Sequence, residues 1–335
     1  MRVFLSVLLL SVASSVCVAE TALSPADATA LLKKISNAIR KQNYHGMYVY
    51  QHDGEVETFR MIHVLDGDNQ LEKHESLDGP VREFVRLNDQ INCYLPEMPA
   101  NPVELRRRVS IKLFPALLPE DPSDIANLYH FKKKDAERVA GIDSAVLMME
   151  PKDSLRYARK LWYDPVSGLL LRIGTYNSRQ EPVEKFSFIQ LDIGGQADRK
   201  ALKPRFANKI PLKPSEMTVA DNDNGRADAG FEIRPMPPGY RLIQEGKRLL
   251  GHRNVQVSHL MVGDGMAAIS VFVEPVQVPN KTSSMMVNQG AINIYTRYTN
   301  DSRITALGDV PEAALKLIGS SVVTKPGKPQ QGAAQ

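Results

Sequence analysis

Histidine and cysteine are the residue types in this chain of 335 residues that could bind a metal or act as a nucleophile. The seven histidines fall singly on predicted strands or turns, without the pairs that a metal site on one helix would show. Cys93 lies in a predicted strand with no evident histidine partner, which favours a buried thiol over a nucleophile. The sequence therefore predicts no metal site, no cofactor and no enzyme. The histidines are His45, His52, His63, His74, His130, His252 and His259.

Two short motifs have the form of ligand-binding loops but stand in the wrong context. Residues 263–268 match a dinucleotide fingerprint, yet a predicted strand follows them where a phosphate-binding helix is required. We expect a hairpin turn there. Residues 221–232 have the spacing of a calcium loop, but Arg226 occupies the position that needs glycine, so this stretch is interpreted as a polar linker.

The first residues of the chain form an export signal. A basic start at Arg2 precedes an apolar run at residues 3–12, and small residues at 17–19 provide a cleavage site. The apolar run ends well short of the ~20 residues that a membrane span needs. We therefore expect a removable signal peptide at residues 1–19 and a mature chain in the periplasm. Cys93 is then the only cysteine left, so an intrachain disulfide is impossible.

The formal net charge of +4 at pH 7 is too small for a general nucleic-acid binder, and no nucleic-acid partner is expected. Local basic clusters remain, chiefly Arg106, Arg107 and Arg108. Such a triplet is usually a solvated face, but it could also meet an acidic partner or an anionic lipid headgroup. The sequence leaves open whether the chain forms a homo-oligomer.

The mature chain opens with one amphipathic helix and continues in strands. Ser24 is a predicted N-cap, followed by Pro25 in the first turn and by apolar residues at helical spacing up to Ile39. From Asn43 the hydrophobic period changes to two, and Asp-Gly pairs separate the strands, which predicts an antiparallel meander. The predicted strands are residues 47–50, 56–64, 81–87, 91–95, 137–150, 157–163, 169–176 and 184–193.

These strands predict one long, curved antiparallel sheet in a first domain at residues 20–195, with its helices against one face. Residues 96–127, which include the apolar segment 113–118, are expected to form a loop with short helices laid on the sheet. Hydrophobicity falls over residues 196–229, the predicted linker. A second domain is expected at residues 230–322 and a disordered tail at 323–335. The expected elements of the second domain are strands near 256–262, 267–273 and 291–299 and a helix from about Pro311 to Gly319.

Large apolar side chains recur at alternate positions of the predicted strands and in the loop between them. On their own they are ordinary core residues. A curved sheet that wraps helices without closing also leaves a concave apolar groove, where an acyl chain would gain about 0.8 kcal/mol per buried methylene. The sequence therefore predicts a lipid site with Arg106, Arg107 and Arg108 as headgroup contacts. Its apolar residues are Phe59, Phe84, Phe114, Leu117, Leu118, Trp162, Phe186 and Phe188.

Segments spread over nearly the whole mature chain resemble the MucB/RseB family, which comprises periplasmic negative regulators of the sigma-E (AlgU-type) envelope stress response. Each motif is short, and the order and spacing of all of them make the match specific. They are residues 43–50, 77–86, 139–141, 162–169, 184–191, 238–240, 264–273, 289–291 and 308–311.

The resemblance implies an α+β fold. Its N-terminal domain would be a half-open antiparallel β-barrel with helices in its mouth, similar to the carriers LolA and LolB, and a smaller α+β C-terminal domain would follow. The family's function would be to bind the periplasmic region of a transmembrane anti-sigma factor of the RseA/MucA type. Binding would protect that region from site-1 proteolysis, and lipopolysaccharide or another acylated lipid would release it. We assign Arg297 and Tyr298 of the second domain to partner contact.

Two other classes of function remain as alternatives. A periplasmic lipid or lipoprotein carrier would use the same apolar groove to transfer cargo, although it has less need of a second domain. An envelope hydrolase is the third hypothesis, and only the scattered histidines support it.

Overall fold

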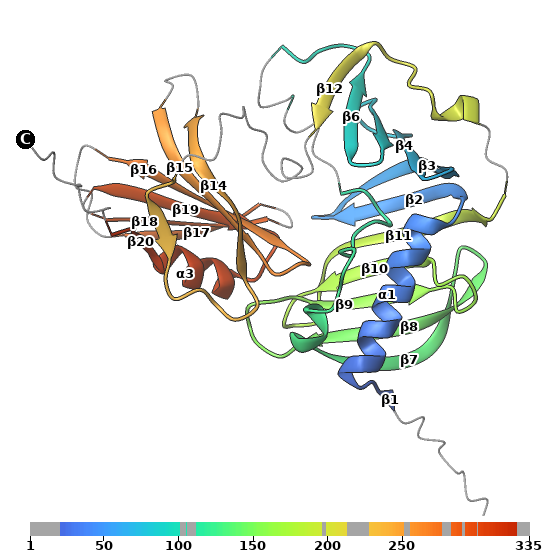
Figure 1. Ribbon diagram of the computed structural model, residues 1–335, viewed down its shortest axis with the longest axis horizontal. Helices are drawn as coiled ribbons and strands as arrows, with labels where there is room; N and C mark the ends of the chain where they lie inside the picture. Colours follow the sequence, from blue (N-terminus) through green and yellow to red (C-terminus); the bar gives the residue numbers. More distant parts are fainter. Residues whose placement is uncertain are drawn as a thin grey trace, which may run out of the picture.

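The computed structural model describes residues 21–100, 105, 112–195, 199–212, 228–250, 255–276, 283–289, 292–299 and 301–326. The predicted signal peptide, the Arg106 to Arg108 triplet and most of the predicted tail lie outside these ranges. Two sheets of different size lie side by side along the long axis of the molecule (Figure 1). None of the helices in the described ranges has the length and hydropathy of a membrane-spanning segment.

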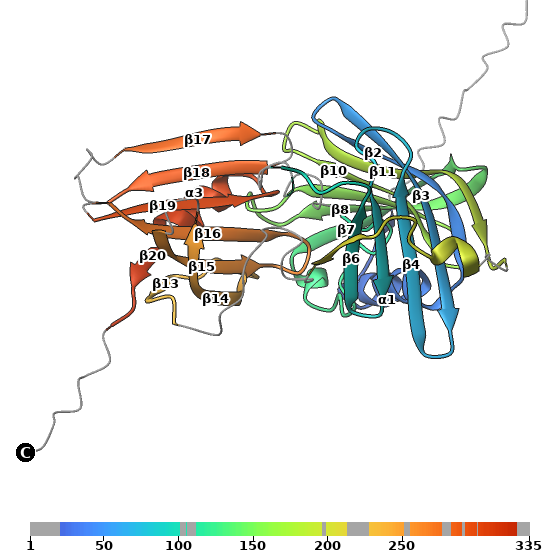
Figure 2. The ribbon, with the colours of Figure 1, turned by 90° about the horizontal axis from the view of Figure 1, so that it is seen from above.

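A twelve-stranded antiparallel sheet forms the N-terminal domain, and its two edge strands do not pair with each other in the described part of the chain. The expected half-open barrel is thus confirmed as a large sheet that curves without closing (Figure 2). In spatial order its strands are β1 (Thr21–Ala22), β7 (Tyr129–Val139), β8 (Ile142–Pro151), β9 (Ala158–Tyr163), β10 (Leu170–Tyr176), β11 (Pro182–Ile193), β2 (Tyr44–His52), β3 (Glu55–Asp66), β4 (Asn69–Ser76), β5 (Glu83–Leu87), β6 (Gln90–Leu95) and β12 (Asn208–Leu212).

Helix α1 (Pro25–Lys41) lies against one face of this sheet (Figure 1). It begins where the sequence predicts, because the Ser24 side chain accepts a hydrogen bond from the Asp27 backbone N–H at 3.1 Å and so caps the helix. On its apolar stripe, Leu32, Ile35 and Ile39 are fully buried in the cluster that the strands form. The helix therefore covers part of the concave face that an open sheet would otherwise expose.

Four strands of this sheet were not predicted as strands of their own. β1 has only two residues, and β7 overlaps the predicted strand at 137–150 only at residues 137–139. The other two are β4 and β12. β4 carries Glu72, Lys73 and His74 at buried positions, so its hydrophobic pattern is hidden. β12 pairs with β6 and brings the sheet into residues 196–229, the range assigned to the linker; the short helix η2 (Arg199–Leu202) lies there as well. A second short helix, η1 (Ile125–Asn127), ends the loop that precedes β7.

The C-terminal domain is built on a six-stranded antiparallel sheet, and helix α3 (Glu312–Ser320) packs on its strands β18 and β19. A two-stranded pair lies beside it. The expected last helix and the hairpin turn at residues 263–268 are both present, the latter between β15 and β16. In spatial order the sheet contains β14 (Arg241–Leu250), β15 (Val255–Gly263), β16 (Ala268–Pro275), β19 (Ser302–Gly308), β18 (Ile292–Tyr298) and β17 (Ser284–Gln289), and the pair is β13 (Phe231–Ile233) with β20 (Val322–Thr324).

Gly46 sits where β2 crosses an irregularity in β11. The register between the two strands shifts between Phe188 and Gln190, so the β11 backbone comes very close to Gly46. A Cβ atom at this position would overlap the carbonyl oxygen of Gln190, which is backbone and cannot move aside cheaply. Only glycine therefore fits in this strand pair.

Replacing Gly46 with alanine should destabilise the N-terminal domain by about 1–3 kcal/mol, because the strands must separate to admit the methyl group. Urea unfolding followed by circular dichroism measures this loss. Gly195→Ala is the matched control, since the nearest atom to its new Cβ would lie at an ordinary contact distance of 3.7 Å. Equal stability of the Gly46 variant and the wild type would contradict the close approach.

Candidate functional site

An apolar cluster fills the concave face of the N-terminal sheet, and Phe114 lies at its centre. The Phe114 ring centroid is 4.9 Å from that of Phe188, 5.6 Å from that of Phe186 and 5.2 Å from that of Tyr48. All four rings are fully buried. Strand residues thus supply the wall of the site, and a loop residue occupies its middle.

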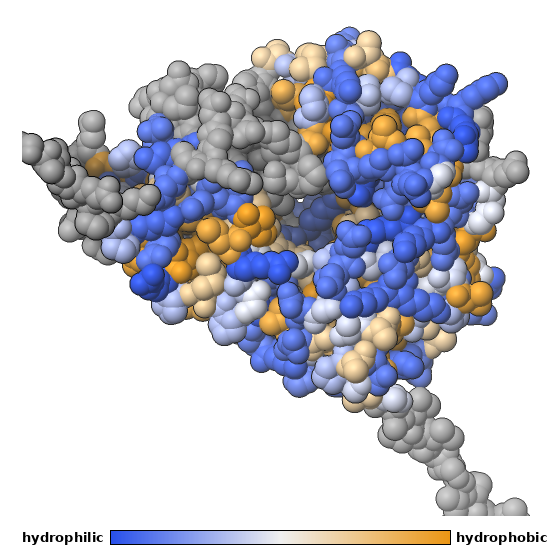
Figure 3. Space-filling model, in the orientation of Figure 1, coloured by the Kyte–Doolittle hydropathy of each residue, from blue (hydrophilic) through white to orange (hydrophobic). Residues whose placement is uncertain are grey.

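The segment Lys112 to Leu118 places the Phe114 ring in the middle of this cluster. Because its side chains fill the concave face, we call this segment the plug. Two side chains of helix α1 bind the C-terminal end of the plug. Arg40 donates to the Leu118 carbonyl at 3.0 Å, and the Ser36 hydroxyl donates to the Pro119 carbonyl at 2.8 Å. The face of the domain that carries α1 is largely hydrophilic in Figure 3. The chain's own side chains therefore fill the apolar site and cover it from water.

Seven of the eight predicted lipid-site residues come together in this cluster. Phe59, Phe84, Phe114, Leu118, Phe186 and Phe188 belong to the buried core, and Leu117 packs against it while half-buried. Strand alternation was the signal on β3 and β11, because Phe59 with Met61, and Phe186 with Phe188, stand two residues apart and belong to the same cluster.

The eighth residue, Trp162, lies on the other side of the sheet, so its assignment to the lipid site was wrong. Its neighbours in β9, Leu161 and Tyr163, belong to the cluster around Phe114, and strand geometry turns the residue between them the other way. The indole N–H donates to Glu137 at 2.8 Å, and Lys160 and Arg172 lie over the ring. Trp162 therefore stabilises the outer face.

The predicted headgroup and partner residues do not join this cluster. Arg106, Arg107 and Arg108 lie outside the described residues. Arg297 and Tyr298 are half-buried on β18 of the C-terminal domain, where the Arg297 guanidinium donates to the Val322 carbonyl at 3.3 Å. Their assignment to partner contact stays a prediction.

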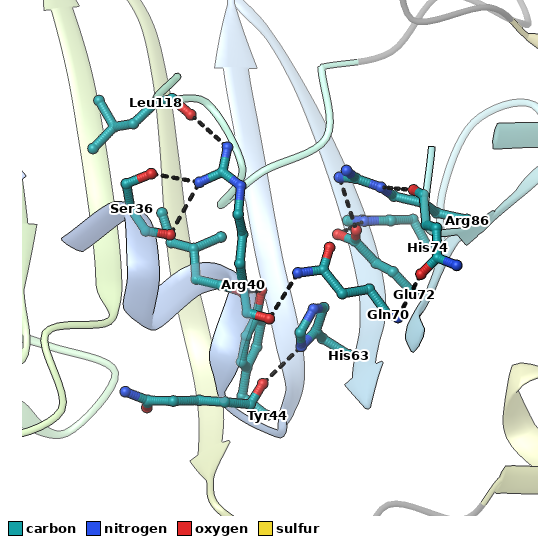
Figure 4. A network of polar contacts seen from close by, with 12 residues as sticks. Ser36, Arg40, Tyr44, His63, Gln70, Glu72, His74, Arg86 and Leu118 are labelled. Carbon is teal, nitrogen blue, oxygen red and sulfur yellow. Dashed lines mark hydrogen bonds and ion pairs between the residues drawn. The ribbon is translucent and has the colours of Figure 1, made fainter. Parts of the chain in front are cut away.

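A buried polar network runs beside the apolar cluster (Figure 4). The Tyr48 hydroxyl and His74 Nδ1 share a hydrogen bond of 3.0 Å, and His74 Nε2 lies 2.6 Å from the Glu72 carboxylate. Arg86 pairs with the same carboxylate at 3.7 Å. Burial would raise the pKa of Glu72, but the charge of His74 and its hydrogen bond outweigh burial, and the pKa is lowered. In the sequence, single histidines are the only signal of this network.

A second histidine of this region, His63, donates from Nδ1 to the Gln42 carbonyl at 2.7 Å and stacks on Tyr44 with ring centroids 4.7 Å apart (Figure 4). Burial lowers the pKa of His63, and the opposing charge of Glu72 does not restore it. The folded protein thus prefers the neutral imidazole.

Stability should fall in two steps as the pH is lowered. Because the pKa of His63 is lowered on folding, its contribution is full above the unfolded value of about 6.5 and is lost as the pH falls through the folded value. The pKa of Glu72 is also lowered on folding, so its contribution to stability is likewise lost as the pH falls below about 4.3. Urea midpoints between pH 8 and 3.5 measure both steps. The His63→Gln variant should lose the first step only, and an unchanged profile in that variant would assign the step to other groups.

An ion-pair cluster ties the Lys112 to Leu118 plug to the C-terminal domain. Lys112 Nζ donates to Glu184 of β11 at 2.7 Å and to Asp309 of the C-terminal domain at 2.6 Å. Burial would lower the pKa of Lys112, but the charges of Asp309 and Glu184 outweigh it, and the pKa is raised. Lys112 is therefore a charged bridge between the two domains, two residues before Phe114.

A second contact between the domains is almost completely buried. Arg156, in the turn between β8 and β9, donates from Nε to Asp264 at 2.8 Å and from a terminal nitrogen to the Pro238 carbonyl at 2.7 Å. The Arg156 and Asp264 side chains are 1% and 2% exposed. Leu155 beside Arg156 packs into the C-terminal core, and Met266 beside Asp264 packs against the N-terminal core.

A cleft with a volume of about 810 Å³ lies between the two domains. Its lining mixes polar and apolar side chains and includes the turns at Asp53 and Gly54 and at residues 177–180, together with Asn288 and Asn293 from the C-terminal sheet. Figure 3 shows a hydrophilic hollow between the two domains. The cleft offers hydrogen-bonding groups from both domains to anything that enters it.

No group of three or more histidine, cysteine or acidic side chains gathers as metal ligands would among the described residues. Cys93 is fully buried in the apolar cluster, and burial raises the pKa of its thiol to about 12. A thiol with such a pKa is protonated near neutrality and is a poor nucleophile. Its expected burial is thus confirmed.

Comparisons with known proteins identify the family. The model of the MucB/RseB N-terminal domain matches residues 27–206, and that of the MucB/RseB C-terminal domain matches residues 225–323. The sigma factor AlgU regulatory protein MucB of Pseudomonas aeruginosa is 26% identical over 301 residues, covering 89% of this chain and 91% of its own. The sigma-E factor regulatory protein RseB of Escherichia coli K12 is 23% identical over 296 residues, covering 88% and 89%.

Solved structures agree on the fold. The crystal structure of MucB in complex with MucA(peri) superposes with a TM-score of 0.72 at 24% identity, and the match covers 90% of this chain and all of that one. The residues that the two family models match contain most of the strands of both sheets. This chain belongs to the MucB/RseB family.

Proposed function

We propose that this protein binds the periplasmic region of a transmembrane anti-sigma factor, protects it from site-1 proteolysis and releases it when a lipid signal arrives. Family membership and the names of its relatives as sigma factor regulatory proteins support the first step. The relative MucB forms a complex with MucA(peri). The leader-like residues 1–19 support a periplasmic location.

The observation that best supports release by a lipid is the plug that fills the concave face. Phe114, Leu117 and Leu118 fill an apolar site whose wall is made by a continuous sheet. An acyl chain would replace those side chains with contacts of the same chemistry and gain about 0.8 kcal/mol per buried methylene. The sheet need not rearrange, because only the plug has to leave.

Displacement of the plug would break a contact with the C-terminal domain. Lys112 begins the plug segment and donates to Asp309, so a plug that swings out pulls its ammonium group away from that carboxylate. The domain junction then loses one of its ion pairs while the buried pair Arg156 and Asp264 stays. Lipid entry and partner release are coupled in this way.

A reconstituted cleavage assay tests the proposed function. The periplasmic region of the anti-sigma factor from the same organism is incubated with site-1 protease, with and without saturating mature protein. We expect cleavage to slow severalfold with the protein present and to recover when acylated lipid is added. An unchanged cleavage time course would exclude protection. Transfer of an acylated protein to an acceptor membrane without any effect on cleavage would favour the lipoprotein carrier instead.

The Asp309→Asn variant tests the coupling. Removing one carboxylate from Lys112 should lower the lipid concentration needed for release by up to about fivefold, as expected for a partly exposed ion pair. Asp228→Asn is the matched control, since Asp228 pairs with Lys325 inside the C-terminal domain. If both variants shift the lipid titration equally, the bridge at Lys112 has no special role.

A further inference from the structure

The two sheets have four edge strands, and three of them carry features that discourage pairing with another chain. β1 is only two residues long. β12 contains Lys209 and Pro211, and β14 presents exposed Arg241 and Lys247. Short length, proline and charge are the usual means by which soluble proteins protect a sheet edge.

β17 has none of these features. Its residues Ser284 to Gln289 include no charge and no proline. It is the outermost strand of its sheet in Figure 2, and no described strand pairs with its outer side. By the rule that holds for the other three edges, β17 is an edge left open for another strand.

One face of this edge is also apolar and exposed. Met285 and Val287 alternate on it and are 59% and 41% exposed, and Ile292 of β18, opposite Gln289, is 43% exposed. Met286 points the other way and packs against the C-terminal core with Tyr295. One face of β17 is therefore held by the C-terminal core, while the opposite face is free to contact apolar side chains of a bound strand.

β17 runs toward the interdomain cleft. Its arrow points at the N-terminal domain in Figure 2, and Asn288 near its end lines the cleft together with Asn293. A chain laid along β17 would enter a space lined by the side-chain amides of Asn288 and Asn293, by turns of the N-terminal domain and by charged side chains such as Arg179 and Glu312. Such groups suit the N–H and C=O groups of an extended backbone.

We propose that β17 accepts an extended, uncharged segment of the anti-sigma factor as an additional strand, whose end continues into the interdomain cleft. The proposal rests on the proposed function, since it names the surface that would hold that partner. Main-chain hydrogen bonds to β17 supply affinity, and apolar residues at alternate positions of the segment contact Met285 and Val287.

The cleft favours a single extended segment over a second copy of this chain. A volume of about 810 Å³ between two folded domains admits a stretch of polypeptide but not the sheet that carries another β17. Pairing of two six-residue strands would also bury far less than the roughly 1,000 Å² that a stable dimer needs. The neutral strand matches a segment without charge.

The double variant Met285→Lys with Val287→Lys tests this surface. Both side chains are already exposed, so the thermal midpoint should stay within a few degrees of wild type. Its affinity for the periplasmic region of the anti-sigma factor, measured by isothermal titration calorimetry, should fall at least tenfold. Leu242→Lys with Ile243→Lys on β14 is the matched control and should bind as the wild type does, because those exposed apolar residues lie on the opposite edge.

Three outcomes separate the possibilities. Wild-type affinity in the β17 variant, with no new amide protection of residues 284–289 in the complex, overturns the surface and leaves the proposed function standing. No binding by the wild type overturns both. A wild-type dimer in sedimentation analysis that the β17 variant abolishes, without loss of partner affinity, assigns the edge to a second copy and overturns the proposal.

Discussion

Replacing Asp264 with alanine should lower the free energy of unfolding by about 2–3 kcal/mol, because it removes one of the two carboxylates that pair with the buried Arg156 guanidinium and leaves only Asp153. Arg156 cannot escape to water easily, since its side chain is 1% exposed and lies 4.9 Å over the Tyr240 ring. Asp264 also accepts the backbone N–H groups of Met266 and Ala267 at 2.9 Å each, so the turn between β15 and β16 loses its cap as well.

The measurement is urea unfolding at pH 7 together with small-angle scattering, which reports whether the two domains remain docked. Asp124→Ala is a control in the same junction, because Asp124 pairs with Arg241 across the domains but both side chains are more than 70% exposed. Such a surface pair contributes under about 1 kcal/mol. Equal losses in the two variants would show that burial does not set the strength of the junction.

Local signals in the sequence were enough to predict much of the fold. Ser24 and Pro25 located the start of α1, and the alternation around Phe186 and Phe188 located the inner face of β11. These features depend on residues near one another in the chain, whose conformations propensity and periodicity describe well. The apolar site could be predicted for the same reason, and Trp162 was misplaced because one residue of error reverses the face of a strand.

What the sequence did not predict depends on side-chain pairs that only the folded strands and turns bring together. β4 looks polar, but its buried charges are satisfied by partners on its own and neighbouring strands: Glu72 by His74, and Lys73 by Glu83 at 3.0 Å. Arg156 and Asp264 are separated by 108 positions, and each looks like an ordinary residue of a polar turn. Only the fold turns them into a buried ion pair, so no local pattern could have indicated the domain junction.

Phe114→Ala is expected to cost about 3–5 kcal/mol of stability, as deletion of a fully buried aromatic side chain usually does. Its effect on lipid should have the opposite sign. If the Lys112 to Leu118 plug competes with an acyl chain, removing its central ring both empties space and makes the plug easier to displace, so acyl affinity should rise.

Phe131→Ala separates this effect from general destabilisation. Phe131 is buried in the same cluster but belongs to β7, which does not move in the plug mechanism. Fluorescent fatty-acid titration should show a gain in affinity for the Phe114 variant that the Phe131 variant lacks at equal loss of stability. Equal gains in affinity would contradict the plug mechanism and show that acyl binding follows loosening of the whole core. The plug mechanism requires a difference, because Phe114 lies in the segment that moves and Phe131 lies in the sheet that does not.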